Sequence, residues 1–216
     1  MTNQEIVSKT KEFVKETMSG DSGHDWWHAL RVYNLAKKIA QQEKGADLFI
    51  VELGALLHDI ADWKFHDSDK EGGKVTRNWL ESLGLDESIV GAVEHIVDNV
   101  SYKGAKVENT MKSLEGKIVQ DADRLDALGA IGIGRTFVYG GHTGSPMWDP
   151  NIKPVLHETA KDYKSSKGTT INHFYEKLLL LKDKMNTETA KQMAQKRHDF
   201  MEEFLKEFFS EWEGKS

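Results

Sequence analysis

Proline is confined to one short stretch of this 216-residue chain. The three prolines stand at positions 146, 150 and 154, and no other position carries one. Proline removes a backbone donor and clashes with the preceding helical turn, so long proline-free segments favour long helices. Apolar residues recur at helical spacing along most of the chain, and no segment alternates clearly as a β-strand does. We therefore expect an all-α fold.

Apolar periodicity and capping residues place the expected helices along the chain. Asp25 and Asp47 precede apolar segments and are expected to cap the helices that follow. The segment 48–64 is apolar on nearly all sides, which is typical of a helix at the centre of a fold. Helices are expected over 2–18, 25–44, 48–64, 72–83, 86–99, 111–138, 171–185 and 187–212, and loops over 101–110 and 140–154.

Composition excludes several classes of protein. The chain has no cysteine, which excludes disulfide frameworks and thiolate metal sites. Its net charge is −6 and it has no basic block, so we expect no nucleic-acid partner. The first residues lack the apolar segment of a signal peptide and no long apolar run follows, which favours a cytoplasmic protein without a membrane partner. An apolar stripe along 187–212 permits a homodimer.

Histidines and carboxylates fall within apolar helical segments at three places. His28 belongs to the segment HDWWH, His58 and Asp59 to the apolar segment LLHDIAD, and Asp123 to the segment QDADRLDAL. A lone histidine on an apolar face is usually a core residue, but a buried carboxylate is costly unless it is paired or binds a metal. Nitrogen and oxygen ligands without sulfur suit a six-coordinate divalent ion such as Mn²⁺, Mg²⁺, Co²⁺, Ni²⁺ or Fe²⁺, and favour Zn²⁺ less.

The order His28, His58-Asp59, Asp123 resembles the H…HD…D signature of the HD-domain metal-dependent phosphohydrolases. The segments GHDWWHALRVYNLA, ALLHDIADWKF and QDADRLDALGAIGIGRTF each resemble local patterns of this family. The branch that is most similar is a small bacterial one related to nucleoside triphosphate pyrophosphohydrolases. The resemblance implies a single HD-domain helical bundle over 1–165 with a buried metal site, and C-terminal helices over 166–216 that pack on the same domain.

The resemblance also implies which residues hold the metal. The four ligands would be His28, His58, Asp59 and Asp123, around one divalent ion for which Mn²⁺ is favoured. Asp123 is chosen over Asp121 because Ala-Asp-Arg-Leu at 122–125 matches the family's context for the last aspartate.

The resemblance further implies residues around the ion. Asp62 follows the HD pair by three positions, where relatives often carry glutamate, and it would orient or deprotonate the attacking water. Arg31, Lys64, His95 and Lys103 would contact the substrate phosphates. A surface carboxylate is the alternative for Asp62, and core packing is the alternative for His95. An exposed solubilising cation is the alternative for Arg31 and Lys103, which lie outside the segment 48–64.

The expected function is a metal-dependent phosphohydrolase that acts on nucleotides. The reaction favoured by the resemblance cleaves a nucleoside or deoxynucleoside triphosphate to the monophosphate and pyrophosphate. A nucleoside monophosphate phosphatase and an alarmone hydrolase are the nearest alternatives. A non-catalytic nucleotide-binding module and an HD-type di-iron oxygenase are more distant alternatives. The oxygenase needs additional histidine ligands between His58 and Asp123, and in that interval only His95 could serve as one.

Overall fold

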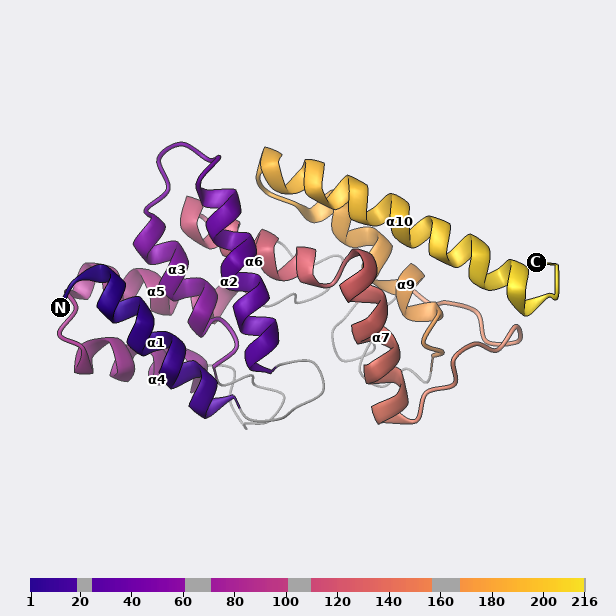
Figure 1. The fold of residues 1–216 in the computed structure, drawn as a ribbon, viewed down its shortest axis with the longest axis horizontal. Helices are drawn as coiled ribbons and strands as arrows, with labels where there is room; N and C mark the ends of the chain where they lie inside the picture. Colours follow the sequence, from indigo (N-terminus) through magenta and orange to yellow (C-terminus); the bar gives the residue numbers. More distant parts are fainter. Residues whose placement is uncertain (19–24, 61–70, 101–109, 157–167, 216) are drawn as a thin grey trace. The chain divides into compact units, whose positions relative to one another are not determined.

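The computed structural model describes residues 1–18, 25–60, 71–100, 110–156 and 168–215, and every regular element within these ranges is helical (Figure 1). The expectation of an all-α fold is therefore confirmed. The described chain forms two compact units, one up to Asp123 and the other from Arg124 onward. No helix in these ranges is long and apolar enough to cross a membrane.

The first unit is built around α3 (Leu48–Leu57), the most apolar helix of the chain. This helix packs against α1 (Asn3–Thr17), α2 (Trp26–Ala40) and α5 (Glu87–Asn99), and α4 (Glu71–Ser82) packs against α5. Five of its ten residues are fully buried, Val51, Leu53, Ala55, Leu56 and Leu57. The prediction that this segment lies at the centre is confirmed.

Capping side chains fix where α2 and α3 begin. The Asp25 carboxylate accepts the backbone N–H of His28 at 2.8 Å, and the Asp47 carboxylate accepts the N–H of Phe49 at 2.9 Å. Each contact satisfies a donor that the first turn of a helix leaves unpaired. Both caps were predicted from the sequence.

The end of α3 differs from the prediction of one helix over 48–64. The helix ends at Leu57, His58 is its C-terminal cap, and residues 58–60 form a turn closed by the Ile60 N–H donating to the Leu57 carbonyl at 3.1 Å. The His-Asp pair therefore follows the helix directly and does not lie within it. Residues 61–70 lie outside the described ranges.

The prediction of one helix over 111–138 is wrong. The structure has two, α6 (Leu114–Asp126) and α7 (Gly129–Thr143), separated by an extended Leu128 and by Gly129 with φ of +72°. A residue with a side chain would be strained in this left-handed conformation, and glycine is not. Helix α7 also continues into the segment expected to be a loop and ends at Gly144.

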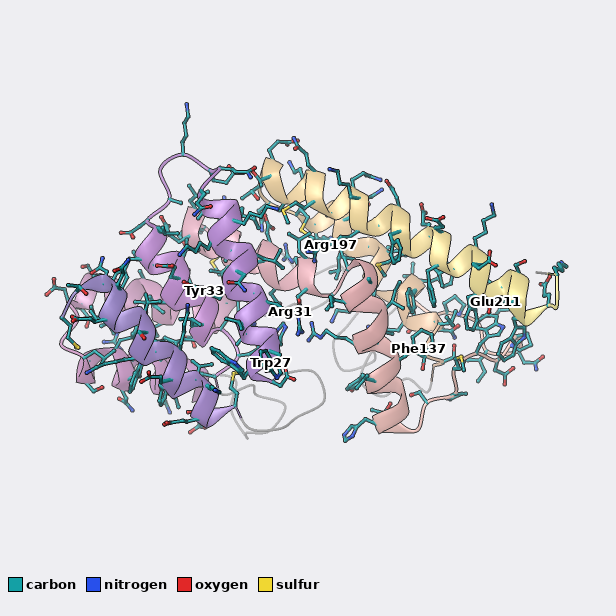
Figure 2. All side chains as sticks on the ribbon, viewed as in Figure 1. Trp27, Arg31, Tyr33, Phe137, Arg197 and Glu211 are labelled. Atoms are coloured by element: carbon teal, nitrogen blue, oxygen red, sulfur yellow. The ribbon has the colours of Figure 1, made fainter. Side chains whose placement is uncertain are left out.

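The second unit gathers aromatic side chains between its helices. Helix α10 (Glu188–Trp212) packs against the 3₁₀ helix η1 (Leu178–Lys184) and against α7, which carries Phe137 (Figure 2). The ring centres of Phe137 and Phe204 lie 6.0 Å apart. The predicted helix 171–185 is instead the short α9 (Asn172–Glu176) followed by η1. The backbone at Lys177 leaves the helical region, and buried Leu178 and Leu181 repeat at the three-residue period of a 3₁₀ helix.

Gly132 and Gly134 of α7 provide a matched test of how closely this helix approaches the turn at Ala127. A methyl group on Gly132 would clash with the backbone carbonyl of Ala127, whereas a methyl group on Gly134 would meet no atom within 4 Å. We expect Gly134→Ala to raise the free energy of unfolding by about 0.5–1 kcal/mol, because alanine restricts the unfolded chain and favours a helix. Gly132→Ala should lower it by about 1–3 kcal/mol.

Urea denaturation of the two variants and of the wild type measures both changes. Equal stability of the two variants would contradict the close approach of α7 to the turn at Ala127.

Candidate metal centre

His28 is the third residue of α2, and the buried face of that helix carries it into the core. Ala29, Val32, Ala36 and Ile39 are fully buried on the same helix, and His28 itself has no exposed surface. The contact from Asp25 fixes the first turn, so the backbone that carries the imidazole is held in place.

His58 is oriented by the last turn of α3. Its Nδ1 lies 2.8 Å from the backbone carbonyl of Ala55, which can only accept a hydrogen bond. Nδ1 therefore donates to this carbonyl, and Nε2 is the ring nitrogen that faces His28. A histidine that donates one ring N–H to a carbonyl in this way is the usual arrangement of a metal ligand.

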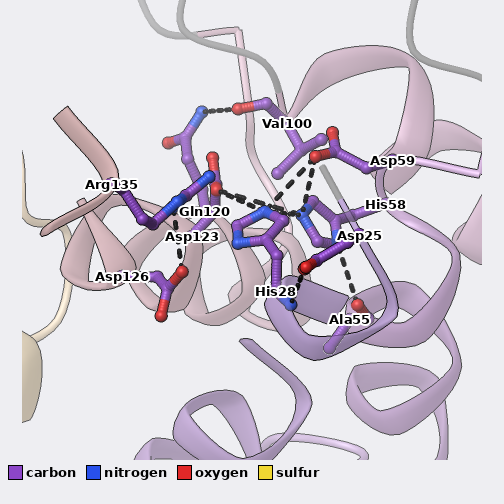
Figure 3. Close-up of polar contacts among 10 residues, drawn as sticks. All are labelled: Asp25, His28, Ala55, His58, Asp59, Val100, Gln120, Asp123, Asp126 and Arg135. Carbon is purple, nitrogen blue, oxygen red and sulfur yellow. Dashed lines mark hydrogen bonds and ion pairs between the residues drawn. The ribbon is translucent and has the colours of Figure 1, made fainter. Parts of the chain in front are cut away.

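Four side chains converge on one point within the first unit (Figure 3). The Nε2 atoms of His28 and His58 are 3.1 Å apart. An oxygen of Asp59 lies 3.3 Å from His28 Nε2 and 3.5 Å from His58 Nε2. An oxygen of Asp123, on α6, lies 3.5 Å and 3.9 Å from the same two nitrogens.

These separations fit a single metal ion. Two ligand atoms that each lie about 2.1 Å from one ion are about 3.0 Å apart at a right angle and about 3.4 Å apart at the tetrahedral angle. The ligand atoms of His28, His58 and Asp59 lie 3.1–3.5 Å from one another, close to this range. Two lone-pair nitrogens and two carboxylates form a net negative donor set without sulfur, which suits a divalent cation.

Burial is graded across the site. The side chains of the two histidines are at most 1% exposed, whereas those of Asp59 and Asp123 are 12% and 29% exposed. The imidazoles thus form the buried side of the site, and the carboxylates form its more solvent-exposed side.

Helix α6 is anchored on both sides of Asp123. Upstream, buried Gln120 donates to the Val100 carbonyl at 3.4 Å. Downstream, within the second unit, Asp126 pairs with Arg135 at 2.9 Å. Sequence reasoning did not identify the carbonyl of Ala55 or Gln120, because a backbone acceptor and a lone amide leave no recognisable sequence pattern.

The structure places the residues that were predicted to act on the substrate in different environments, and some of them lie outside the described ranges. Arg31 is half-buried on α2, one turn beyond His28. His95 is exposed on α5, where the Asn99 amide donates to its backbone carbonyl at 2.9 Å. The structure therefore places His95 outside the core, and its substrate contact stays a prediction. Asp62, Lys64 and Lys103 lie outside the described residues.

With this geometry in place, comparisons with known proteins identify the class. The model of the HD domain family matches residues 26–128, the span that carries all four converging side chains. The chain is 40% identical over 187 residues to the Bacillus subtilis protein YpgQ, which covers 86% of this chain and 83% of that protein. This chain belongs to the HD-domain family, whose members bind divalent metals.

Solved structures agree with this assignment. An HD-superfamily hydrolase from Bacillus thuringiensis is 46% identical and superposes with a TM-score of 0.77, covering 98% of this chain and 99% of that one. The structure of Bacillus subtilis YpgQ in complex with ADP is 34% identical, with a TM-score of 0.78 and coverage of 98% and 97%. The fold is therefore that of an HD-superfamily hydrolase.

Removal of one imidazole tests the metal centre. We expect His58→Ala to weaken Mn²⁺ binding by more than about 100-fold, because even the loss of an outer hydrogen-bond partner costs 10–100-fold. Isothermal titration of chelator-treated protein with Mn²⁺ measures the change.

His142→Ala serves as the matched control, since His142 is exposed on α7 in the second unit. An unchanged Mn²⁺ affinity in His58→Ala would remove this cluster as the metal site.

Proposed function

We propose that this protein is a metal-dependent phosphohydrolase that converts nucleoside or deoxynucleoside triphosphates to monophosphate and pyrophosphate. The observation that carries the proposal is the convergence of His28 Nε2, His58 Nε2 and the Asp59 carboxylate, with Asp123 beside them. Nucleotide as the substrate class is supported by the ADP complex of Bacillus subtilis YpgQ. We propose residues 1–165 as the catalytic domain, residues 166–216 as its C-terminal helices, and a homodimer as the assembly.

His28, His58, Asp59 and Asp123 would hold one divalent ion, for which we propose Mn²⁺ and accept Mg²⁺, Co²⁺, Ni²⁺ or Fe²⁺ as substitutes. When bound, the ion would lower the pKa of a water and offset the charge of phosphate oxygens. The imidazoles are buried and the two carboxylates are partly exposed, so we propose that substrate approaches from the side of the carboxylates.

Side chains around the metal ligands would accept the proton of the attacking water and bind the phosphates. We propose that Asp62 accepts the proton of the water that attacks the α-phosphorus, while the bond to the bridging oxygen breaks and pyrophosphate leaves. Arg31 is one helical turn from His28, which suits a guanidinium that holds phosphate oxygens. Lys64, His95 and Lys103 are proposed as further phosphate contacts.

Product analysis distinguishes this reaction from its neighbours. The protein is incubated with Mn²⁺ and with mono-, di- and triphosphates of ribose and deoxyribose nucleosides, and chromatography resolves the products. We expect equal amounts of monophosphate and pyrophosphate from triphosphates, and no turnover by Asp59→Ala.

Free phosphate from monophosphates would instead establish a phosphatase, the second candidate. Loss of pyrophosphate from an alarmone would establish an alarmone hydrolase. Absence of turnover with every nucleotide and metal would contradict the proposed function.

A pair of variants tests the general base. Asp62→Asn keeps the shape of the side chain and removes its charge, so we expect kcat to fall by about 10²–10⁴ while Mn²⁺ affinity is unchanged. Asp62→Glu restores the carboxylate that relatives often carry and should retain most of the activity. Full activity in Asp62→Asn, measured by steady-state kinetics, would show that another group accepts the proton.

A further inference from the structure

Trp27 is a large aromatic residue that the fold leaves in solvent beside the metal ligands. It directly precedes His28 in the first turn of α2, yet 62% of its surface is exposed while His28 is fully buried. Tryptophan is highly buried on average, so such exposure next to a functional site points to a contact with something other than the core. The Asp25 cap holds this turn, so the exposed indole extends from a fixed backbone.

Helix geometry orders three side chains around α2. Successive residues turn by about 100°, so Arg31 lies about 60° around the helix from His28, and Trp27 lies about 40° beyond Arg31. Trp27 and Arg31 are four residues apart, which places them on one face about 6 Å apart along the axis. Both are labelled on α2 in Figure 2. Around α2, therefore, the buried His28 is followed by the half-buried Arg31 and then by the exposed Trp27.

This order matches the chemical order of a nucleotide. Phosphates require cations, and the metal ion that the ligand cluster would hold, together with Arg31, would supply that end. A base offers a flat aromatic face, and an indole is a suitable partner because stacking is tolerant of base identity. We propose that Trp27 is the residue on which the nucleotide base stacks. This inference rests on the proposed function and extends it from the phosphates to the base.

The proposal has a consequence for specificity. Every base has an aromatic face, so a single stacking residue gives affinity without strong selection among bases. Purines have the larger ring system, and we expect them to bind more tightly than pyrimidines for that reason. Trp27 would then hold the base end of the nucleotide while the metal ligands and Arg31 hold the phosphate end.

Binding of two probes tests the stacking contact without requiring turnover. ADP carries both a base and a diphosphate, whereas inorganic diphosphate carries only the second. Isothermal titration of the Mn²⁺-loaded full chain gives the Kd of each probe. We expect Trp27→Leu to weaken ADP binding by about 10- to 100-fold, the range of one base–aromatic stack, and to leave diphosphate binding unchanged. Trp27→Phe should remain within a few-fold of the wild type.

Trp212→Leu is the matched control, because Trp212 is 50% exposed at the end of α10 and belongs to the second unit. Unchanged ADP affinity in Trp27→Leu, with nucleotide turnover intact in the wild type, would overturn the stacking contact alone. Equal weakening of ADP and diphosphate would also overturn it, because the phosphate end would then be affected. A wild type that neither binds nor hydrolyses any nucleotide would overturn both this inference and the proposed function.

Discussion

Two buried imidazole nitrogens, His28 Nε2 and His58 Nε2, lie 3.1 Å apart where α2 packs on α3, and the candidate site depends on that contact. Polar groups removed from water cost free energy unless they find partners, and negative oxygens of Asp59 and Asp123 stand next to these nitrogens. A divalent cation held by His28, His58 and Asp59 would resolve the problem, because it would bind the imidazole nitrogens and offset carboxylate charge together. The close packing of α2 on α3 holds the two rings at this distance.

The sequence was sufficient for the fold class, because that depends on patterns of residue type. The four proposed ligands were taken from a family resemblance in the order His28, His58-Asp59, Asp123. His28, His58, Asp59 and Asp123 stand out as polar residues within apolar segments, and the structure brings them together. The breaks in helices were not predicted. Periodicity continues across Gly129, so only the left-handed backbone there reveals that α6 and α7 are separate helices. The exposure of His95 was missed because its neighbours in α5 are apolar.

The difference between buried and exposed residues explains why residues that contact substrate are harder to predict from sequence than residues that bind a metal. A polar side chain that is buried within an apolar segment, as His28 and His58 are, costs free energy unless it is paired, and this makes it visible in the sequence. A substrate contact must be accessible, so Arg31 or Trp27 looks like any surface residue until the helix is in place. Arg31 and Trp27 are distinguished from other surface residues by their angular position around α2 relative to His28, which becomes apparent only once the helix is placed in the fold.

The hydrogen bond from His58 Nδ1 ends on the main chain at Ala55 and not on a side chain. Any amino acid at position 55 that keeps the last turn of α3 would supply the same carbonyl, so the tautomer of His58 is protected against most point mutations there. Residue 55 is therefore free to vary according to core packing alone, and a comparison of sequences would give no sign that it orients a metal ligand. The last turn of α3 thus determines which ring nitrogen of His58 donates a hydrogen bond. Substitutions elsewhere that shift this turn would therefore change the orientation of the imidazole.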